Sequence, residues 1–296
     1  MRTSVTDEDL PGIWSVGDKM SGDGQKATLI LLTAKNFGLI AAALLSLAGL
    51  RFISAWILYA TVAALVLALV AETVNTVLKP AERWYQGRAI AESAKTLAWK
   101  YTVGAEPFGY GLNQDPKAVL HERLSELARY ADDSVVIDSG HLGSTEKMDE
   151  VRDCSLEVRK EVYLRDRIKD QHAWYASKAE LNRCRAKTWS FLLIALEAIA
   201  IALSVIQVYY EWSAPVTPLI TTIVACIGSW VAIKQFSNLA AAYTTAANEI
   251  SLVERTVKKA NSESWGNVVS EAEDAISREH TMWLASRNWQ GPPTPR

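Results

Sequence analysis

Four polar side chains lie in or directly after an apolar run, 189–210, that is long enough to cross a bilayer. They are Glu197, Ser204, Gln207 and Glu211, separated by seven, three and four residues. On a helix these positions fall within about 80° of one another. A carboxylate at membrane depth costs about 2.5–3.5 kcal/mol and usually faces a bundle interior or a water-filled path. This polar stripe is therefore a candidate for the part of the chain that acts.

Two interpretations of the polar stripe stay open. Its side chains can line a pore, where carboxylates favour cations. They can also form a packed seam, because small residues let helices approach and polar residues bond across them. Glu72, in an earlier apolar run, is a further pore-lining candidate. Its place near one end of that run favours an ion pair with Lys79 instead.

The distribution of charge predicts the elements that position these residues. Hydrophobic residues make up 49% of the 296 residues and charged residues 22%, but each of two long stretches, 36–78 and 189–233, contains only two charged residues. Such segregation is typical of a membrane protein with polar helical parts. We therefore predict an all-α integral membrane protein with two transmembrane helical hairpins. Its four predicted spans are 27–50, 52–73, 189–210 and 216–233.

Basic residues flank the hairpins at their open ends. Lys79 and Arg83 follow the first hairpin, and Arg183 and Arg185 precede the second, whereas Arg51 alone marks the turn of the first. The positive-inside rule then places both termini in the cytoplasm. We predict a multi-pass protein of the bacterial inner (plasma) membrane.

The chain repeats one plan, a hairpin with polar helices attached, in two copies. The predicted divisions are a flexible or lightly ordered polar arm at 1–26, a first hairpin with its following cytoplasmic helices at 27–131, a loop at 132–144, a second hairpin with long cytoplasmic helices at 145–290, and a tail at 291–296. Outside the spans, the periodicity predicts helices at 80–103, 117–131, 146–187, 235–261 and 265–287. The third of these contains no Pro or Gly, so we predict that it runs unbroken into the span that begins at Trp189.

Other classes of function find little support in the composition. The net charge of −2 argues against binding of nucleic acid. The cysteines Cys154, Cys184 and Cys226 match no metal or redox spacing. We find no P-loop, dinucleotide fingerprint, nucleophile elbow or zinc-protease motif. We therefore predict no catalytic residue, no metal, no cofactor and no enzymatic activity.

Two segments carry a family resemblance. Residues 82–108 read ERWYQGRAIAESAKTLAWKYTVGAEPF, and residues 163–189 read YLRDRIKDQHAWYASKAELNRCRAKTW. Both resemble the SLATT family, two-transmembrane effector domains associated with bacterial nucleotide-synthetase (SMODS) and nucleotide-sensor (SLOG) proteins. The whole chain is similar to a tandem of two such domains.

Eleven residues of these two segments are expected to be structural. Trp84 and Tyr85 are candidate interfacial anchors, and Glu92 is spaced for helical ion pairs with Arg88 and Lys95. The basic residues of the second segment are expected to contact anionic lipid head groups, with a nucleotide as the alternative ligand. The full set is Trp84, Tyr85, Arg88, Glu92, Lys95, Trp99, Arg167, Gln171, Trp174, Tyr175 and Lys178.

The resemblance implies a membrane effector of a bacterial nucleotide-linked conflict or antiphage defence system. Such effectors are proposed to form or gate a pore that disrupts the inner membrane, and this is the function we predict. The expected partners are membrane lipid, further copies of the chain in a homo-oligomer, and a cytoplasmic nucleotide-sensing or nucleotide-synthesising protein. The alternative is a non-conducting, membrane-anchored scaffold or sensor whose cytoplasmic helices oligomerise and recruit a partner.

Overall fold

The protein is described by a computed structural model in which residues 4–52, 54–110, 114–131, 137–210 and 216–286 are placed. Within these residues, four helices are long and apolar enough to cross a membrane, which confirms the predicted all-α fold with four spans.

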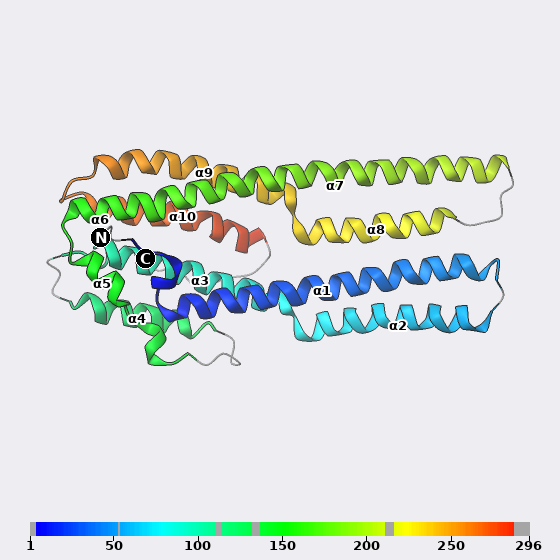
Figure 1. The fold of residues 1–296 in the computed structure, drawn as a ribbon, viewed down its shortest axis with the longest axis horizontal. Coiled ribbons are helices and arrows are strands. Elements are labelled where there is room, and N and C mark those ends of the chain that lie inside the picture. The colour runs from blue at the N-terminus through cyan, green and yellow to red at the C-terminus, as the bar shows by residue number, and fades with distance from the viewer. Residues whose placement is uncertain (1–3, 53, 111–113, 132–136, 211–215, 287–296) are drawn as a thin grey trace. The chain divides into compact units, whose positions relative to one another are not determined.

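The spans form two antiparallel hairpins (Figure 1). In the first hairpin, α1 (Gly12–Gly49) lies beside α2 (Ala55–Leu78). In the second hairpin, α7 (Asp170–Tyr209) lies beside α8 (Val216–Lys234). The other elements are α3 (Pro80–Val103), α4 (Pro116–Ala128), α5 (Glu146–Arg152), α6 (Leu156–Val162), α9 (Phe236–Lys259) and α10 (Trp265–Ser286), the π-helix η3 (Tyr163–Lys169), and the short 3-10 helices η1 (Asp7–Asp9) and η2 (Ser139–Leu142).

Local signals explain several helix ends. The helix α2 stops where Lys79 adopts the left-handed conformation, with φ 43°. Pro80 opens α3 because proline is tolerated at the first helical position, where its missing N–H has no intrahelical partner. Gly104, with φ 69°, ends α3. Asp115 caps α4 by accepting a hydrogen bond from the backbone nitrogen of Lys117.

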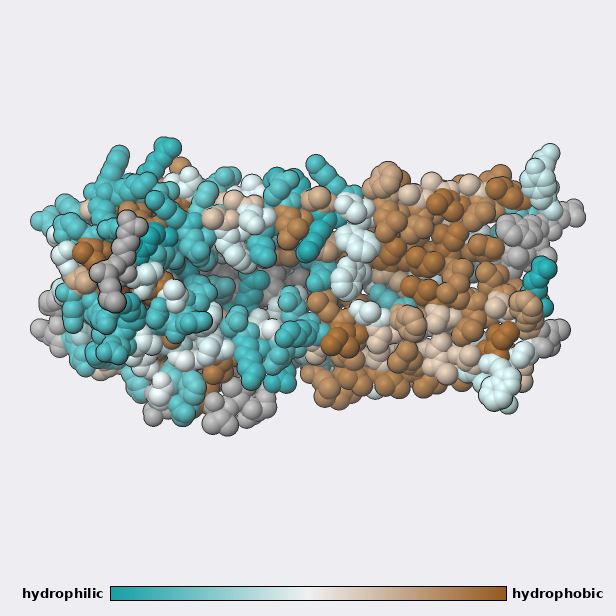
Figure 2. All heavy atoms as spheres, viewed as in Figure 1, coloured by the Kyte–Doolittle hydropathy of each residue, from teal (hydrophilic) through white to brown (hydrophobic). Residues whose placement is uncertain are grey.

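The chain divides into two compact units. We call residues Gln25–Pro80 and Glu180–Ala240 the transmembrane unit, and residues Met1–Gly24, Ala81–Ala179 and Ala241–Arg296 the polar unit. Figure 2 shows hydrophobic residues over the surface of the spans and hydrophilic residues over the polar unit.

The transmembrane unit exposes large apolar side chains, as a surface in contact with lipid requires. Trp56, Phe191 and Val208 are 80%, 75% and 83% exposed. Inside the first hairpin the packing is close, because a Cβ on Gly38 of α1 would lie 2.6 Å from the carbonyl oxygen of Ala64 in α2. Glycine at this position therefore sets how near the two backbones lie.

The polar unit has a hydrophobic core to which several helices contribute. Ile13 of α1, Ile90 and Leu97 of α3, Leu124 of α4 and Met148 of α5 are buried together. This core makes the polar unit a folded body rather than a set of separate helical extensions.

The prediction of a flexible arm at 1–26 is wrong for most of its length. The helix α1 begins at Gly12, and Ile13 and Met20 are 0% and 4% exposed. Glycines lower helix propensity by about 1 kcal/mol each, but burial of the apolar residues between them outweighs that cost.

The prediction of one unbroken helix over 146–187 is also wrong. The helix α5 ends at Arg152, and α6 begins at Leu156 after Ser155 has taken an extended conformation. Residues 163–169 then form a π-helix. The break lets Arg152 donate hydrogen bonds from Nη1 to the carbonyl of Tyr101 and from Nη2 to that of Phe108. Serine is a favoured residue directly before a helix, so it permits this restart without Pro or Gly.

Candidate functional site in the transmembrane unit

Glu197 lies on α7 inside the apolar run, and its side chain is exposed on the surface of the chain. Among the described residues, none pairs with its carboxylate through a hydrogen bond or an ion pair. Its neighbours one turn away, Ile194 and Ile201, are apolar and are 65% and 67% exposed. A carboxylate at this depth without a polar partner is costly. The face around Glu197 is thus the least satisfied part of the span.

Ser204 and Gln207 lie on the side of α7 that packs against α8. The Ser204 hydroxyl oxygen is 3.2 Å from that of Thr217, and Thr217 donates a hydrogen bond of 2.9 Å to Oε1 of Gln207. Ala200, one turn before Ser204, is 8% exposed. These two polar side chains are bonded inside the hairpin, whereas Glu197 is exposed. Glu211, the fourth member of the polar stripe, lies outside the described residues.

Glu72 pairs with Lys35 of α1, whose Nζ lies 2.8 Å from Oε2 of the carboxylate. The predicted pairing with Lys79 is therefore wrong. Residues seven apart on a helix are separated by about 10 Å along its axis, whereas the antiparallel neighbour α1 brings Lys35 alongside Glu72. The ion pair joins the two helices of the first hairpin.

A polar contact that the sequence analysis did not identify joins α1 to α8. The side-chain amide of Asn36 donates hydrogen bonds to the Cys226 carbonyl and to the Ser229 hydroxyl, both at 3.1 Å. A side-chain amide in a span needs such partners, because lipid offers none. Asn36 was visible in the sequence as a polar residue in the first span, but its partner lies 193 residues away.

Replacing Lys35 with Met should destabilise the transmembrane unit by about 1 kcal/mol, because Glu72 then has no counter-charge. Chemical unfolding in mixed micelles measures the effect. The double replacement Lys35→Met with Glu72→Leu removes both charges, so its loss should be smaller than the sum of the two single losses. Strictly additive losses would show that the two side chains do not interact.

We call the two segments with the family resemblance, residues 82–108 and 163–189, the first and the second motif. Most of the first motif lies on α3, in the polar unit. Trp84 and Trp99 are 7% and 3% exposed, so both pack inside the protein. Trp84 is not the lipid-facing anchor suggested by the sequence. Its ring centroid lies 5.4 Å from that of Tyr85, and the ring of Trp99 packs edge-on against Tyr163 at 6.0 Å. The contact between Trp99 and Tyr163 joins α3 to η3.

The charged residues of the first motif are partly buried on the same helix. Lys95 pairs with Asp7 at 2.6 Å, so the predicted pairing of Lys95 with Glu92 is wrong. The reason is that η1 carries an acidic segment to α3. Arg88 and Glu92 are half-buried, and the Glu92 carboxylate contributes to the electrostatic environment of Arg167.

The second motif contains a buried ion pair. Arg167 of η3 and Glu273 of α10 are 1% and 0% exposed at their side chains. Nε of Arg167 lies 3.0 Å from Oε1 of Glu273, and Nη2 lies 2.7 Å from Oε2. The Tyr163 hydroxyl donates a further bond of 2.9 Å to Oε1. Arg167 therefore joins η3 to α10. The predicted contact of Arg167 with lipid head groups is wrong, because its side chain is buried in this ion pair.

Burial and charge act in opposite senses on this pair. Burial tends to lower the pKa of Arg167, but the Glu273 carboxylate outweighs burial and raises the pKa above its usual value. Burial, together with the same carboxylate, raises the pKa of Tyr163 well above its usual value. Arg167 thus stays charged and Tyr163 stays neutral, which keeps the network intact across the physiological pH range.

The remaining residues of the second motif lie on the first turns of α7. Tyr175 is 4% exposed, and its ring centroid lies 5.6 Å from that of Tyr243 in α9. Trp174 packs against the same tyrosine at 5.4 Å, and Nζ of Lys178 lies 5.7 Å from the Trp174 ring centroid. Gln171 is half-buried nearby. These contacts join α7 to α9.

Two apolar hairpins with charged side chains inside the spans, together with a polar helical unit, define a multi-pass helical membrane protein. Residues 11–160 match the family model of SMODS and SLOG-associating 2TM effector domain 3, and residues 163–283 match that of SMODS and SLOG-associating 2TM effector domain 1. The chain belongs to this SLATT family and carries two of its domains in tandem. Comparison with curated proteins and with solved structures gives no match. The predicted division of the chain at 132–144 stays a prediction.

Proposed function

We propose that this membrane effector acts by self-association in a bacterial inner membrane, which forms or gates a path for cations at the Glu197 face of α7. One observation carries the proposal: a carboxylate inside a span is exposed and has no partner among the described residues of its own chain. Lipid chains cannot solvate this group. Water in a pore, or polar groups of a neighbouring copy, would solvate it.

Two other side chains of the polar stripe support this proposal by fixing the hairpin, although they do not line the proposed path themselves. Ser204 and Gln207 bond to Thr217 and so fix α7 against α8. That seam holds the hairpin in one orientation, while the Glu197 side chain, two turns earlier on the same side of α7, stays exposed and can meet a second copy. A ring of such carboxylates favours cations over anions.

The family description supports a role of this activity in a bacterial conflict system. The matched domains are named effectors that associate with SMODS and SLOG proteins. We infer that the trigger comes from a nucleotide-synthesising or nucleotide-sensing partner in a conflict system, and that the polar unit faces the cytoplasm to receive it. The activity would be conduction rather than catalysis.

Replacing Glu197 with Gln should reduce cation flux through the purified protein in liposomes by about tenfold, because a charged ring raises the local cation concentration by about that factor or more. The measurement is dye-reported ion flux, with reversal potentials to give selectivity. The matched control is Glu180→Gln on the same helix, a carboxylate that is 71% exposed outside the apolar run. An equal effect of both replacements, or conduction by wild type that is indifferent to Glu197, would refute the proposed path.

The second candidate function is a membrane-anchored scaffold that does not conduct. The bonds from Ser204 and Gln207 to Thr217 favour it, because they close part of the polar stripe inside one hairpin. It predicts that wild-type protein forms oligomers in nanodiscs without any ion flux. In that case Glu197→Gln would alter the oligomer and leave the membrane sealed.

A further inference from the structure

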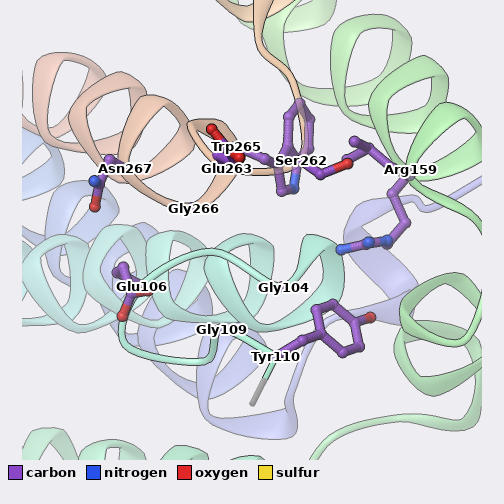
Figure 3. A pocket seen from close by; sticks show the side chains of 11 residues that line it. Gly104, Glu106, Gly109, Tyr110, Arg159, Ser262, Glu263, Trp265, Gly266 and Asn267 are labelled. Atoms are coloured by element: carbon purple, nitrogen blue, oxygen red, sulfur yellow. The ribbon is translucent and has the colours of Figure 1, made fainter. Parts of the chain in front are cut away.

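A cavity of about 400 Å³ opens on the polar unit where the loop after α3 meets α6 and the start of α10 (Figure 3). Gly104, Tyr110 and Arg159 line one side, and Trp265 and Gly266 line another. This volume lies within the range of cavities that hold small molecules. The cavity is separate from the polar groups of the spans.

Arg159 is the unusual feature of this cavity. Its side chain extends toward Gly104 and Tyr110 in Figure 3, and the residue is 9% exposed. Nη1 donates a hydrogen bond of 2.6 Å to the Val103 carbonyl, while Nε is buried without a partner. Among the described residues, no carboxylate forms an ion pair with this guanidinium. Buried charges are normally paired, so the cavity contains an uncompensated positive charge.

A second arginine adds to that charge. Arg152 is 7% exposed, donates to two backbone carbonyls, and likewise has no carboxylate partner among the described residues. The Tyr110 ring lies close to both guanidinium groups, with its centroid 4.5 Å from Cζ of Arg159 and 5.0 Å from Cζ of Arg152. Burial lowers the pKa of Arg159, and the charge of Arg152 lowers it further. An anion in the cavity would relieve both effects.

The remaining wall of the cavity also suits an anion. The helix α10 begins at Trp265, and Gly266, which has no side chain, lines the cavity in its first turn. The backbone nitrogens of Trp265 and Val268 already donate to the carbonyls of Asn261 and Ser264, so the N–H groups of Gly266 and Asn267 are the ones left for an anion. Two carboxylates, Glu106 and Glu263, also line the cavity, but both are exposed. Water screens exposed charges far more than it screens a buried guanidinium. The Arg159 guanidinium is therefore the least screened charge of the cavity.

We propose that this cavity binds a small phosphate-bearing molecule whose phosphate group pairs with the Arg159 guanidinium. The planar guanidinium can offer two parallel donors to phosphate oxygens. The exposed carboxylates of Glu106 and Glu263 then accept hydrogen bonds from donor groups at the other end of the molecule. The site belongs to the polar unit and does not depend on whether the spans conduct.

The test measures binding of inorganic phosphate to the full-length protein in detergent, by calorimetry and by the rise in unfolding temperature, against chloride at the same ionic strength. Wild type should show saturable binding. Arg159→Met should weaken binding at least about tenfold, because the phosphate loses its paired charge. Arg129→Gln removes an exposed arginine from the same unit and should bind phosphate like wild type.

A second readout separates binding from a structural role. In Arg159→Met the Val103 carbonyl still accepts a hydrogen bond of 2.8 Å from Nε1 of Trp265, and an uncompensated buried charge is gone. The free variant should therefore unfold at the wild-type temperature or above it. If that variant does not fold, Arg159→Lys, which keeps the charge but loses the planar fork, should bind more weakly than wild type. No phosphate effect on wild type, or the same loss in Arg129→Gln, would overturn the proposal.

Discussion

Replacing Arg167 with Met should lower the free energy of unfolding by about 3–5 kcal/mol, as expected when one partner of a buried ion pair is removed. The Glu273 side chain is 0% exposed, and without Arg167 its carboxylate keeps only the hydrogen bond from Tyr163. Denaturant unfolding of the purified protein, followed by circular dichroism, measures the loss. Lys147→Met, which breaks a surface pair with Glu150 in the same unit, should cost less than about 1 kcal/mol.

A combined variant tests whether the missing charge is the cause. Arg167→Met with Glu273→Leu and Tyr163→Phe removes both charges and the hydroxyl together. Because desolvating the pair offsets much of its attraction, this variant should recover most of the stability that Arg167→Met loses. Even the native network leaves Nη1 of Arg167 without a partner. If the combined variant were no more stable than Arg167→Met, shape rather than charge would explain the loss.

Sequence patterns located the elements that depend on local signals. The spans followed from two stretches that are almost free of charge, and α8 begins at Val216 as predicted. The prediction for α3 matches at both ends, Pro80 and Val103, because proline and glycine mark those ends directly. Such signals act within a few residues, so a single sequence is enough to interpret them.

Elements that depend on tertiary contacts were missed. The start of α1 at Gly12 conflicts with local propensity and is explained only by burial of Ile13 and Met20. The partners Arg167 and Glu273 are 106 residues apart, and nothing in either neighbourhood identifies the other. The π-helix at Tyr163–Lys169 has no sequence signal of its own.

The candidate site shows the same limit at the level of single side chains. Sequence spacing placed Glu197, Ser204 and Gln207 on one side of a helix. It could not decide whether that side packs against another helix or lines a pore. The structure bonds Ser204 and Gln207 to Thr217 and leaves Glu197 exposed. Because Glu197 and Ser204 lie on the same side of α7 about two turns apart, the difference arises along the helix and depends on how α8 packs there, which helical spacing alone does not contain. Arg159 escaped notice for a similar reason, because burial rather than residue type makes it unusual.

The crossing of α1 and α3 in the polar unit depends on two glycines. A Cβ on Gly87 would lie 2.6 Å from the carbonyl oxygen of Gly17, and one on Gly17 would lie 2.8 Å from the backbone nitrogen of Ala91. Both obstacles are backbone atoms of a facing helix, so a rotamer change cannot relieve them. Each glycine therefore has a packing reason that offsets its poor helix propensity.

Gly87→Ala should destabilise the polar unit by about 1–3 kcal/mol, because the added methyl group forces α1 away from α3. The matched control is Gly22→Ala on α1, where an added Cβ meets nothing within 4 Å. That change should stabilise the protein by about 0.5–1 kcal/mol, since alanine is the better helix former. The same denaturant unfolding experiment measures both variants. If the free energy of unfolding falls in Gly87→Ala and rises in Gly22→Ala, close packing at the α1–α3 crossing explains the difference. A gain in stability from Gly87→Ala would show that the two helices do not pack this closely.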